Sequence, residues 1–302
     1  MNRAMRAVTG LAAATASLVI AATPALSAPQ APKVDPGITF GYTVVDARSG
    51  ETTLEGNEHE QFRSASVVKL LIALDYLEGL EPGAEIPSED KALLQPMLRS
   101  SNDDAASTFW VRGGQKAIVE RMADKLDLDD TQPPVKEGTW GYTAISASDV
   151  AKTYQYVLND AEPEVRDFIM GNLRKHTRCA DDGFDQSFGL ADAPGADAVK
   201  QGWSGFGAAP EPGKECKDSS DDPATTARVL SSPEVARARQ IAPGEDPDGA
   251  PDIDLKRPAM HTTGTVEDGD KIVVLLTLEP EKTDWQTAAK RTTQIARALA
   301  VA

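Results

Sequence analysis

Strand-forming segments lie at both ends of this chain, and helix-forming segments lie between them. Residues 38–56 alternate β-branched and aromatic residues around the turn DARSG, and residues 260–278 form a similar pattern around EDGD. Both patterns predict β-hairpins. Residues 285–300 predict a closing amphipathic helix. Because strands from the two ends share one sheet only if the middle of the chain leaves it, we expect an α+β fold, with an antiparallel sheet built from both chain ends and a helical subdomain inserted.

The inserted part reads as a series of helices over about 80–175. Residues 88–109 look helical but interrupted at Pro96, and SSND reads as a cap that restarts the helix. Further helical patterns lie at residues 66–79, 114–126, from Ser146 onward with a capping-box-like Asp149, and 161–174. Residues 197–207 predict a short strand, and 208–258, rich in Pro, Asp, Ser and Gly, predict a surface insertion.

The first 28 residues read as a secretory signal peptide. Arg3 and Arg6 precede the small apolar stretch 8–22, and PALSA offers small residues around a cut. The apolar part is too short for a membrane span, and no cysteine near the cut could carry a lipid. We therefore expect a secreted protein, with residues 29–36 as a Pro-rich lead-in and residues 37–302 as one folded domain.

Charge and cysteine content narrow the class of protein further. The formal net charge is −16, and it becomes −18 when Arg3 and Arg6 are removed, which argues against nucleic acid or an anionic membrane as partner. In a secreted chain, the two cysteines, Cys179 and Cys216, predict a disulfide. The three histidines are scattered without metal-ligand spacing, so we expect no metal and no cofactor.

A serine and a lysine open the apolar segment FRSASVVKLLIALDYLEGL. Ser66 and Lys69 are three residues apart, on one face of the expected helix. A lysine whose pKa is lowered by burial can take the proton of a serine hydroxyl and make it a nucleophile. The alternative is a helix-capping serine beside a surface lysine, because S-x-x-K alone is common.

Two further motifs follow in chain order. Residues 97–106 read MLRSSNDDAA, and Lys200-Gln201-Gly202 stands in the expected strand. S-x-x-K, an S-D-N-like element and a K-T-G-like element in this order are the signature of penicillin-recognising serine enzymes. From about residue 40 to the C-terminus, the segment after residue 207 excepted, the chain resembles the class A β-lactamase and penicillin-binding-protein superfamily. The resemblance implies a β-lactamase/transpeptidase-like fold.

The resemblance also implies roles for individual residues. Ser66 matches the acylated nucleophile and Lys69 the base beside it. Ser101 matches the serine that relays a proton to the leaving nitrogen. Lys200 matches the strand lysine that supports the relay and attracts a substrate carboxylate. The backbone N–H groups of Ser66 and Trp203 match the two donors of the oxyanion hole.

The substrate-binding positions depart from the family pattern. Asp103 stands where the family has an asparagine; when ionised it cannot donate a hydrogen bond, and its charge opposes an anionic substrate. Gln201 replaces a short hydroxyl residue, and the bulky Trp203 follows Gly202. These four residues are expected to line the substrate site, with altered preference.

Two assignments have alternatives. Glu137, in PPVKEGTWGYT, is the candidate for the loop glutamate that drives deacylation in class A β-lactamases, although it also reads as a solvated loop acid. The stretch His261-Thr262-Thr263-Gly264 competes with Lys200-Gln201-Gly202 for the third motif, but its extra threonine disturbs the spacing.

The expected function is that of a secreted serine hydrolase. It would act through an acyl-enzyme at Ser66 on an amide or ester, either a peptidoglycan-derived peptide or a β-lactam-like molecule. The alternatives are a catalytically impaired relative that binds such ligands, and a true class A-like β-lactamase. We expect a monomer without membrane insertion.

Overall fold

The computed structural model describes residues 31–217 and 253–302. The expected signal peptide, the first two residues of the Pro-rich lead-in and most of the expected insertion 208–258 lie outside the described residues. The strands are β1 (Thr39–Asp46), β2 (Thr52–Gly56), β3 (Phe62–Arg63), β4 (Ala144–Ile145), β5 (Ala196–Ser204), β6 (Ala259–Val266) and β7 (Lys271–Leu278). The α-helices are α1 (Lys69–Glu78), α2 (Ser88–Arg99), α3 (Asp103–Arg112), α4 (Lys116–Leu126), α5 (Ala147–Asn159), α6 (Pro163–Leu173) and α9 (Trp285–Ala300).

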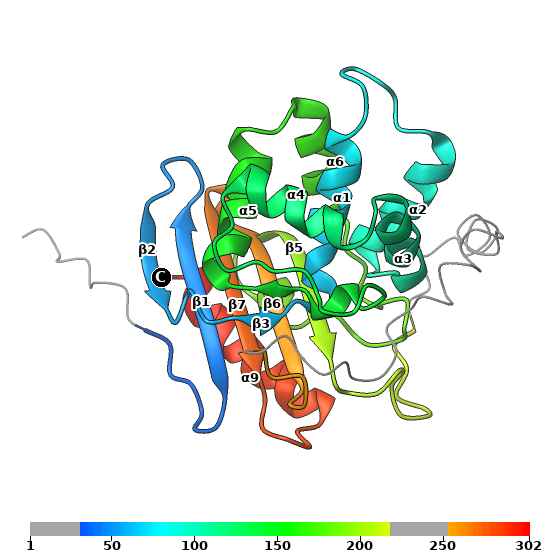
Figure 1. The fold of residues 1–302 in the computed structure, drawn as a ribbon. Helices are drawn as coiled ribbons and strands as arrows, with labels where there is room; N and C mark the ends of the chain where they lie inside the picture. Colours follow the sequence, from blue (N-terminus) through cyan, green and yellow to red (C-terminus); the bar gives the residue numbers. More distant parts are fainter. Residues whose placement is uncertain (1–30, 218–252) are drawn as a thin grey trace, which may run out of the picture.

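The two ends of the chain form one five-stranded antiparallel sheet, as expected. Its strand order is β2-β1-β7-β6-β5, so the N-terminal strand β1 pairs along its whole length with β7 near the C-terminus. In Figure 1 the blue strands β1 and β2 lie beside the orange β7 and β6. Strand β5 occupies the opposite edge of the sheet. The α+β fold class predicted from the order of elements is therefore confirmed.

Both faces of the sheet are covered. Alternate residues of β7 belong to two cores: Ile272, Val274 and Leu276 pack on the helical side, whereas Val273 and Leu275 pack with residues of α9. A strand buried on both faces reads as a continuous apolar run, which explains KIVVLLTL. Figure 1 shows α9 on one face and the other helices on the opposite side.

Helix α1 is the central helix of the helical side. Seven of its ten residues are buried, and they include the first residue, Lys69. A helix that is apolar on all sides belongs inside a core. Helix α2 corrects one expectation, since it runs through Pro96 to Arg99 instead of breaking there. The predicted caps are present, because Asn102 accepts a hydrogen bond from the backbone N–H of Ala105 and Ser146 accepts one from that of Asp149.

Candidate active site

The nucleophile candidate lies on a tight turn ahead of α1. Ser66 belongs to a short 3-10 helix (η1, Ala65–Val68) that leads directly into α1, and Ala65 has a left-handed φ of 44°. Such a φ is costly for a residue with a Cβ, and it persists only where the surroundings enforce it. Two residues before Ala65, the buried Arg63 guanidinium donates to Ser204 Oγ at 2.6 Å and to the backbone carbonyl oxygens of Asp254 and Arg257.

The buried amine of Lys69 contacts three residues of the first two motifs. Its Nζ is completely buried and donates to Ser66 Oγ at 2.8 Å, to the Ser101 carbonyl oxygen at 2.5 Å and to Asp103 Oδ1 at 2.6 Å. The amine also lies 4.9 Å from the centre of the Trp140 ring. The three donors of an ammonium group therefore all have acceptors here.

A second serine–lysine pair joins the second and third motifs. Lys200 Nζ donates to Ser101 Oγ at 2.7 Å, and Ser101 has a left-handed φ of 62° that turns it toward the site. Burial, and secondly the charge of Lys69, hold the pKa of Lys200 well below its ordinary value. A lysine of that kind suits the predicted proton relay better than the predicted role as a fixed cation for a substrate carboxylate.

Strand β5 approaches the nucleophile turn closely. A Cβ on Gly202 would lie 3.0 Å from the Ser64 carbonyl oxygen and 2.9 Å from Val67 Cγ2, so this approach requires a glycine. The competing motif lies one strand further in, on β6. His261 is buried there, donates from Nε2 to the Arg63 carbonyl oxygen at 2.8 Å and accepts at Nδ1 from the Thr277 backbone N–H. The described structure therefore favours Lys200-Gln201-Gly202 as the third motif.

Two of the expected substrate-binding side chains are placed differently. The amide of Gln201 is buried and donates to the carbonyl oxygens of Phe188 and Gln186, so it holds that segment, and its contact with a substrate stays a prediction. The indole of Trp203 packs edge-on against Phe184 and Trp285, and its Nε1 donates to Asp182 Oδ2 at 3.0 Å. Only the backbone of Trp203 is then left for the oxyanion role.

Three carboxyl groups surround the two lysines, and two of them were missed by sequence reasoning. Asp103 has an exposed side chain (62%) and is ion-paired with Lys69. Burial raises the pKa of Asp181 and of Asp182, and the charge of Asp103 raises both further while that of Lys69 lowers them. In the sequence, the available signal was their position two and three residues after Cys179. In the structure, the Asp181 backbone N–H donates to the Ser100 carbonyl oxygen, beside the second motif.

Glu137 lies apart from this cluster. It is exposed, and its recorded hydrogen bond is made by its backbone carbonyl oxygen, which accepts from Trp110 Nε1. The residue of the same loop that does face Lys69 is Trp140. Among the described residues, the side chain of Glu137 makes no hydrogen bond or ion pair with the cluster, and its deacylating role stays a prediction.

The chain resembles solved structures of class A β-lactamases over most of its length. One from Mycobacterium abscessus matches with a TM-score of 0.55 and 15% identity, over 86% of this chain and 92% of that chain. One from Bacteroides cellulosilyticus DSM 14838 matches with a TM-score of 0.57 and 14% identity, over 87% and 91%. A mutant of PBP-A, solved as an acyl-enzyme complex with penicillin G, matches with a TM-score of 0.56 and 13% identity, over 88% and 90%.

The chain has a β-lactamase-like fold. No protein-family model matches the chain. Proteins named "Putative lipoprotein LppW" from Mycobacterium bovis and Mycobacterium tuberculosis are 36% identical over 173 residues, 55% of this chain and 54% of the relative. The match thus spans about half the length of these curated relatives.

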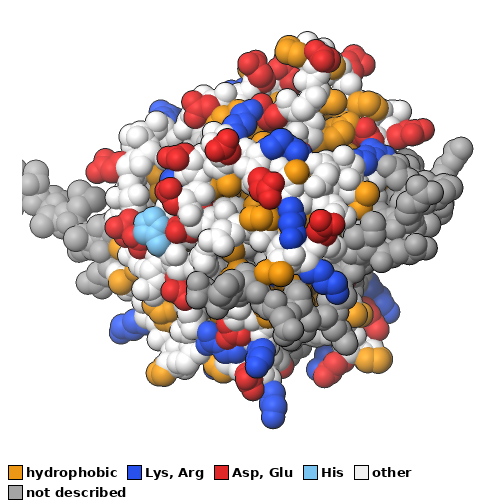
Figure 2. Space-filling model, viewed as in Figure 1, with side chains coloured by type: hydrophobic (Ala, Val, Ile, Leu, Met, Phe, Trp, Pro, Cys, Tyr) orange, Lys and Arg blue, Asp and Glu red, His pale blue; other side chains and the backbone are white. Residues whose placement is uncertain are grey.

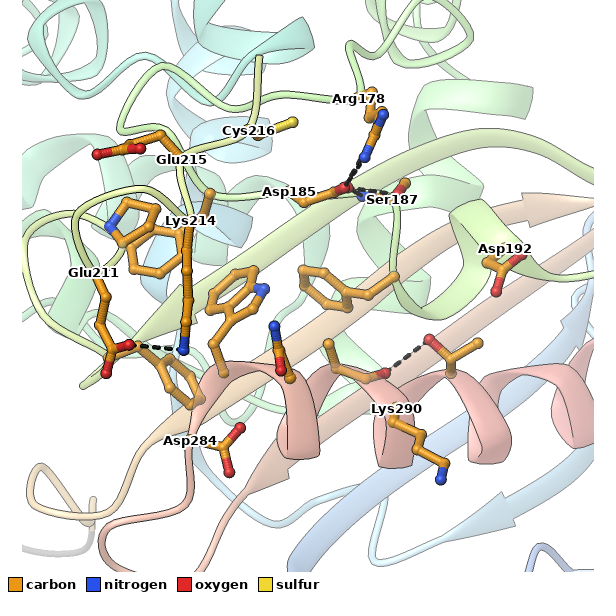
Figure 3. A pocket seen from close by; sticks show the side chains of 18 of the residues that line it. Arg178, Asp185, Ser187, Asp192, Glu211, Lys214, Glu215, Cys216, Asp284 and Lys290 are labelled. Atoms are coloured by element: carbon orange, nitrogen blue, oxygen red, sulfur yellow. Dashed lines mark hydrogen bonds and ion pairs between the residues drawn. The ribbon is translucent and has the colours of Figure 1, made fainter. Parts of the chain in front are cut away.

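A large cavity among the described residues lies away from the cluster of Ser66, Lys69, Ser101 and Lys200. It has a volume of about 1080 Å³ and lies between α9 and the segment that contains Cys216. Figure 3 shows its aromatic floor and its rim of paired charges, among them Lys214 with Glu211 at 2.7 Å and Arg178 with Asp185 at 2.9 Å. None of Ser66, Lys69, Ser101 and Lys200 lines it, so this cavity is separate from the candidate active site.

The predicted disulfide is present, with Cys179 joined to Cys216 across 37 positions. Figure 2 shows acidic and basic side chains intermixed over the face seen there, without one dominant basic patch. Within residues 31–217 and 253–302, no helix is both long and apolar enough to cross a membrane. The same residues contain no group of three metal-ligating side chains.

Proposed function

We propose that the protein is a secreted serine hydrolase that acts through an acyl-enzyme at Ser66. The observation that carries the proposal is the convergence of two serine–lysine pairs from distant parts of the chain. Lys69 Nζ lies 2.8 Å from Ser66 Oγ, and Lys200 Nζ lies 2.7 Å from Ser101 Oγ. A nucleophile, a base and a second proton carrier within hydrogen-bond reach are what acyl transfer requires.

The substrate class we propose is an amide or ester of the cell wall or a β-lactam-like molecule. The solved complex of PBP-A with penicillin G supports this choice, as does the shared fold. Export is supported by the disulfide and by the name lipoprotein given to LppW. We propose residues 1–28 as signal peptide, residues 37–302 as the hydrolase domain and a monomer as the working unit.

The test is covalent labelling of the mature chain. Incubation with a fluorescent penicillin or a fluorophosphonate, read by intact mass and peptide mapping, should add one adduct at Ser66. Ser66→Ala should abolish the adduct, whereas Ser49→Ala, an exposed serine in the turn after β1, should not change it. If none of the probes modifies Ser66, the proposal is wrong.

A second candidate is a catalytically silent relative that binds the same ligands. It is favoured by the exposed position of Glu137 and by the ion pair that occupies Lys69. A thermal shift with cell-wall fragments in the absence of any Ser66 adduct would support it. A true class A-like β-lactamase would instead hydrolyse nitrocefin and lose that turnover on Lys69→Ala.

A further inference from the structure

An acyl-enzyme at Ser66 needs a group that activates water, and the contacts of the described residues do not join the Glu137 side chain to Ser66 or Lys69. The carboxylate that does lie against the catalytic lysine is Asp103, whose Oδ1 accepts from Lys69 Nζ at 2.6 Å. We propose that Asp103 is the general base that activates the water for hydrolysis of the Ser66 acyl-enzyme. This inference rests on the proposed function and adds to it how the acyl group is released.

The distance between base and nucleophile suits one water molecule. Asp103 Oδ1 and Ser66 Oγ are separated by no more than two consecutive hydrogen bonds, of 2.6 and 2.8 Å, which share Lys69 Nζ. A base acts on a reacting group directly or through one intervening water at this range. A water bound to the Asp103 carboxylate would therefore lie within reach of an acyl carbon on Ser66.

Exposure separates Asp103 from the other members of the cluster. Its side chain is 62% exposed, whereas that of Lys69 is 0% exposed. Asp103 is also the first residue of α3, and the Asn102 side chain caps that helix at Ala105 with a hydrogen bond of 2.8 Å. The carboxylate is thus held by a capped helix end on one side and is open to water on the other.

Lys69 cannot act on the water alone. Once it has taken the Ser66 proton in acylation it is an ammonium group, which has no lone pair with which to accept a proton from water, and its neighbours are Ser66 Oγ, the Ser101 carbonyl oxygen and Asp103 Oδ1. In this arrangement the titratable acceptor in direct contact with Lys69 is the Asp103 carboxylate.

The protons balance over both steps. In acylation, Ser66 Oγ bonds to the substrate carbonyl carbon and gives its proton to the Lys69 amine. The bond to the leaving nitrogen or oxygen breaks as Ser101 Oγ gives that atom a proton, and Lys200 replaces the proton on Ser101 Oγ. In deacylation, water gives a proton to the Asp103 carboxylate as its oxygen attacks the acyl carbon. The bond to Ser66 Oγ breaks and Oγ takes back a proton from Lys69, while Asp103 releases its proton to solvent and Lys200 takes one up, which restores both lysines.

The test measures how long the adduct on Ser66 survives. The mature protein is labelled with fluorescent penicillin, freed of excess probe by desalting and followed by intact mass. Asp103→Asn, which keeps the shape but cannot accept a proton, should lose the adduct at least 10-fold more slowly than the wild type. Asp104→Asn, which removes the same charge one residue further along, should lose it at the wild-type rate. Asp103→Glu should restore release to within several-fold.

The outcomes separate this inference from the proposed function. Absence of any wild-type adduct refutes both. A wild-type adduct that Asp103→Asn releases at the same rate, or that the wild type itself never releases, refutes the role of Asp103 alone. If Asp103→Asn shows no cooperative melting transition, Asp103→Glu is measured instead, because it keeps the carboxylate that pairs with the buried Lys69, and release of its adduct more than 100-fold slower than release by the wild type would refute the role of the carboxylate.

Discussion

Lys200 is the residue whose burial most changes its chemistry. Its side chain is 1% exposed and its pKa is held well below the ordinary value by burial and by the nearby charge of Lys69. A lowered pKa makes it easier for the amine to give a proton to Ser101 Oγ, which lies 2.7 Å away. We therefore propose that Lys200 serves proton transfer to the leaving group.

We expect Lys200→Ala to slow the formation of the Ser66 adduct by about 100-fold or more, because Ser101 loses its proton partner. The measurement is the second-order rate constant of labelling with fluorescent penicillin. Lys290→Ala, an exposed lysine on α9, is the matched control and should label at the wild-type rate. Equal rates for the two variants would contradict the relay.

His261 makes stability depend on pH. Burial lowers its pKa to about 4, whereas the unfolded chain keeps a value near 6.5. Between these values the unfolded state binds the proton and the native state does not, so stability is full above pH 6.5 and falls as the pH drops toward 4. The loss should reach up to about 3 kcal/mol.

Urea unfolding at several pH values between 7 and 4 checks this expectation. His261→Gln should be less stable at pH 7 but should show a flatter decline. His59→Gln is the control: Asp130 raises the pKa of the exposed His59, so any stability it contributes is lost only above pH 6.5. A wild-type slope that His261→Gln leaves unchanged would place the effect elsewhere.

At the scale of elements, the site depends on how closely β5 approaches the turn that carries Ser66. Gly202 makes the approach possible, and on the neighbouring strand β6 a Cβ on Gly264 would lie 2.1 Å from the Ala198 carbonyl oxygen. Thr263 Oγ1 donates to the Lys200 carbonyl oxygen at 2.9 Å and holds the two strands in register. Small residues on β5 and β6 therefore set the position of both lysine-bearing elements.

We expect Gly202→Ala to push β5 away from the Ser64 carbonyl oxygen. Overpacking of this kind costs about 1–3 kcal/mol of stability, and a shift of the oxyanion donor should slow labelling of Ser66 at least about 10-fold. Melting temperature and labelling rate are the measurements. Gly171→Ala, on α6 with no atom within 4 Å of the added Cβ, should leave the labelling rate unchanged and should not lower the melting temperature, because alanine favours a helix over glycine.

At the scale of the whole molecule, the disulfide restrains the segment that carries Asp181 and Asp182. Cys179 and Cys216 enclose Asp181, Asp182 and the whole of β5, and the Asp181 backbone N–H donates to the Ser100 carbonyl oxygen at 2.8 Å. The cross-link therefore connects the third motif to the second. A closed loop of 37 positions restricts the unfolded chain considerably.

We expect the double variant Cys179→Ser, Cys216→Ser to lose about 2–4 kcal/mol of stability and to label more slowly at Ser66. Reduction of the wild type should reproduce both effects, and urea unfolding with and without reductant measures the first. An unchanged unfolding midpoint after complete reduction would show that the packing around Trp203 holds the segment without the cross-link.

Local signals in the sequence determined the elements and their order. The strands and the caps at Asn102 and Ser146 are predicted from patterns of a few residues, and the disulfide is predicted from the cysteine count and the expected export. None of these predictions requires knowledge of the fold. The spacing of Ser66 and Lys69 likewise placed both on one turn. The sequence predicts an interruption at Pro96, but α2 continues through this residue to Arg99.

Tertiary structure decided which side chains meet. Three contacts join separate segments of the β-lactamase-like fold: Lys69 with Asp103, Lys200 with Ser101, and Gln201 with the Phe188 carbonyl oxygen. No local periodicity predicts on which side of β5 the Gln201 amide lies, or that the Trp140 indole faces Lys69. The sequence named the chemical groups, and long-range packing selected the partners that determine their protonation.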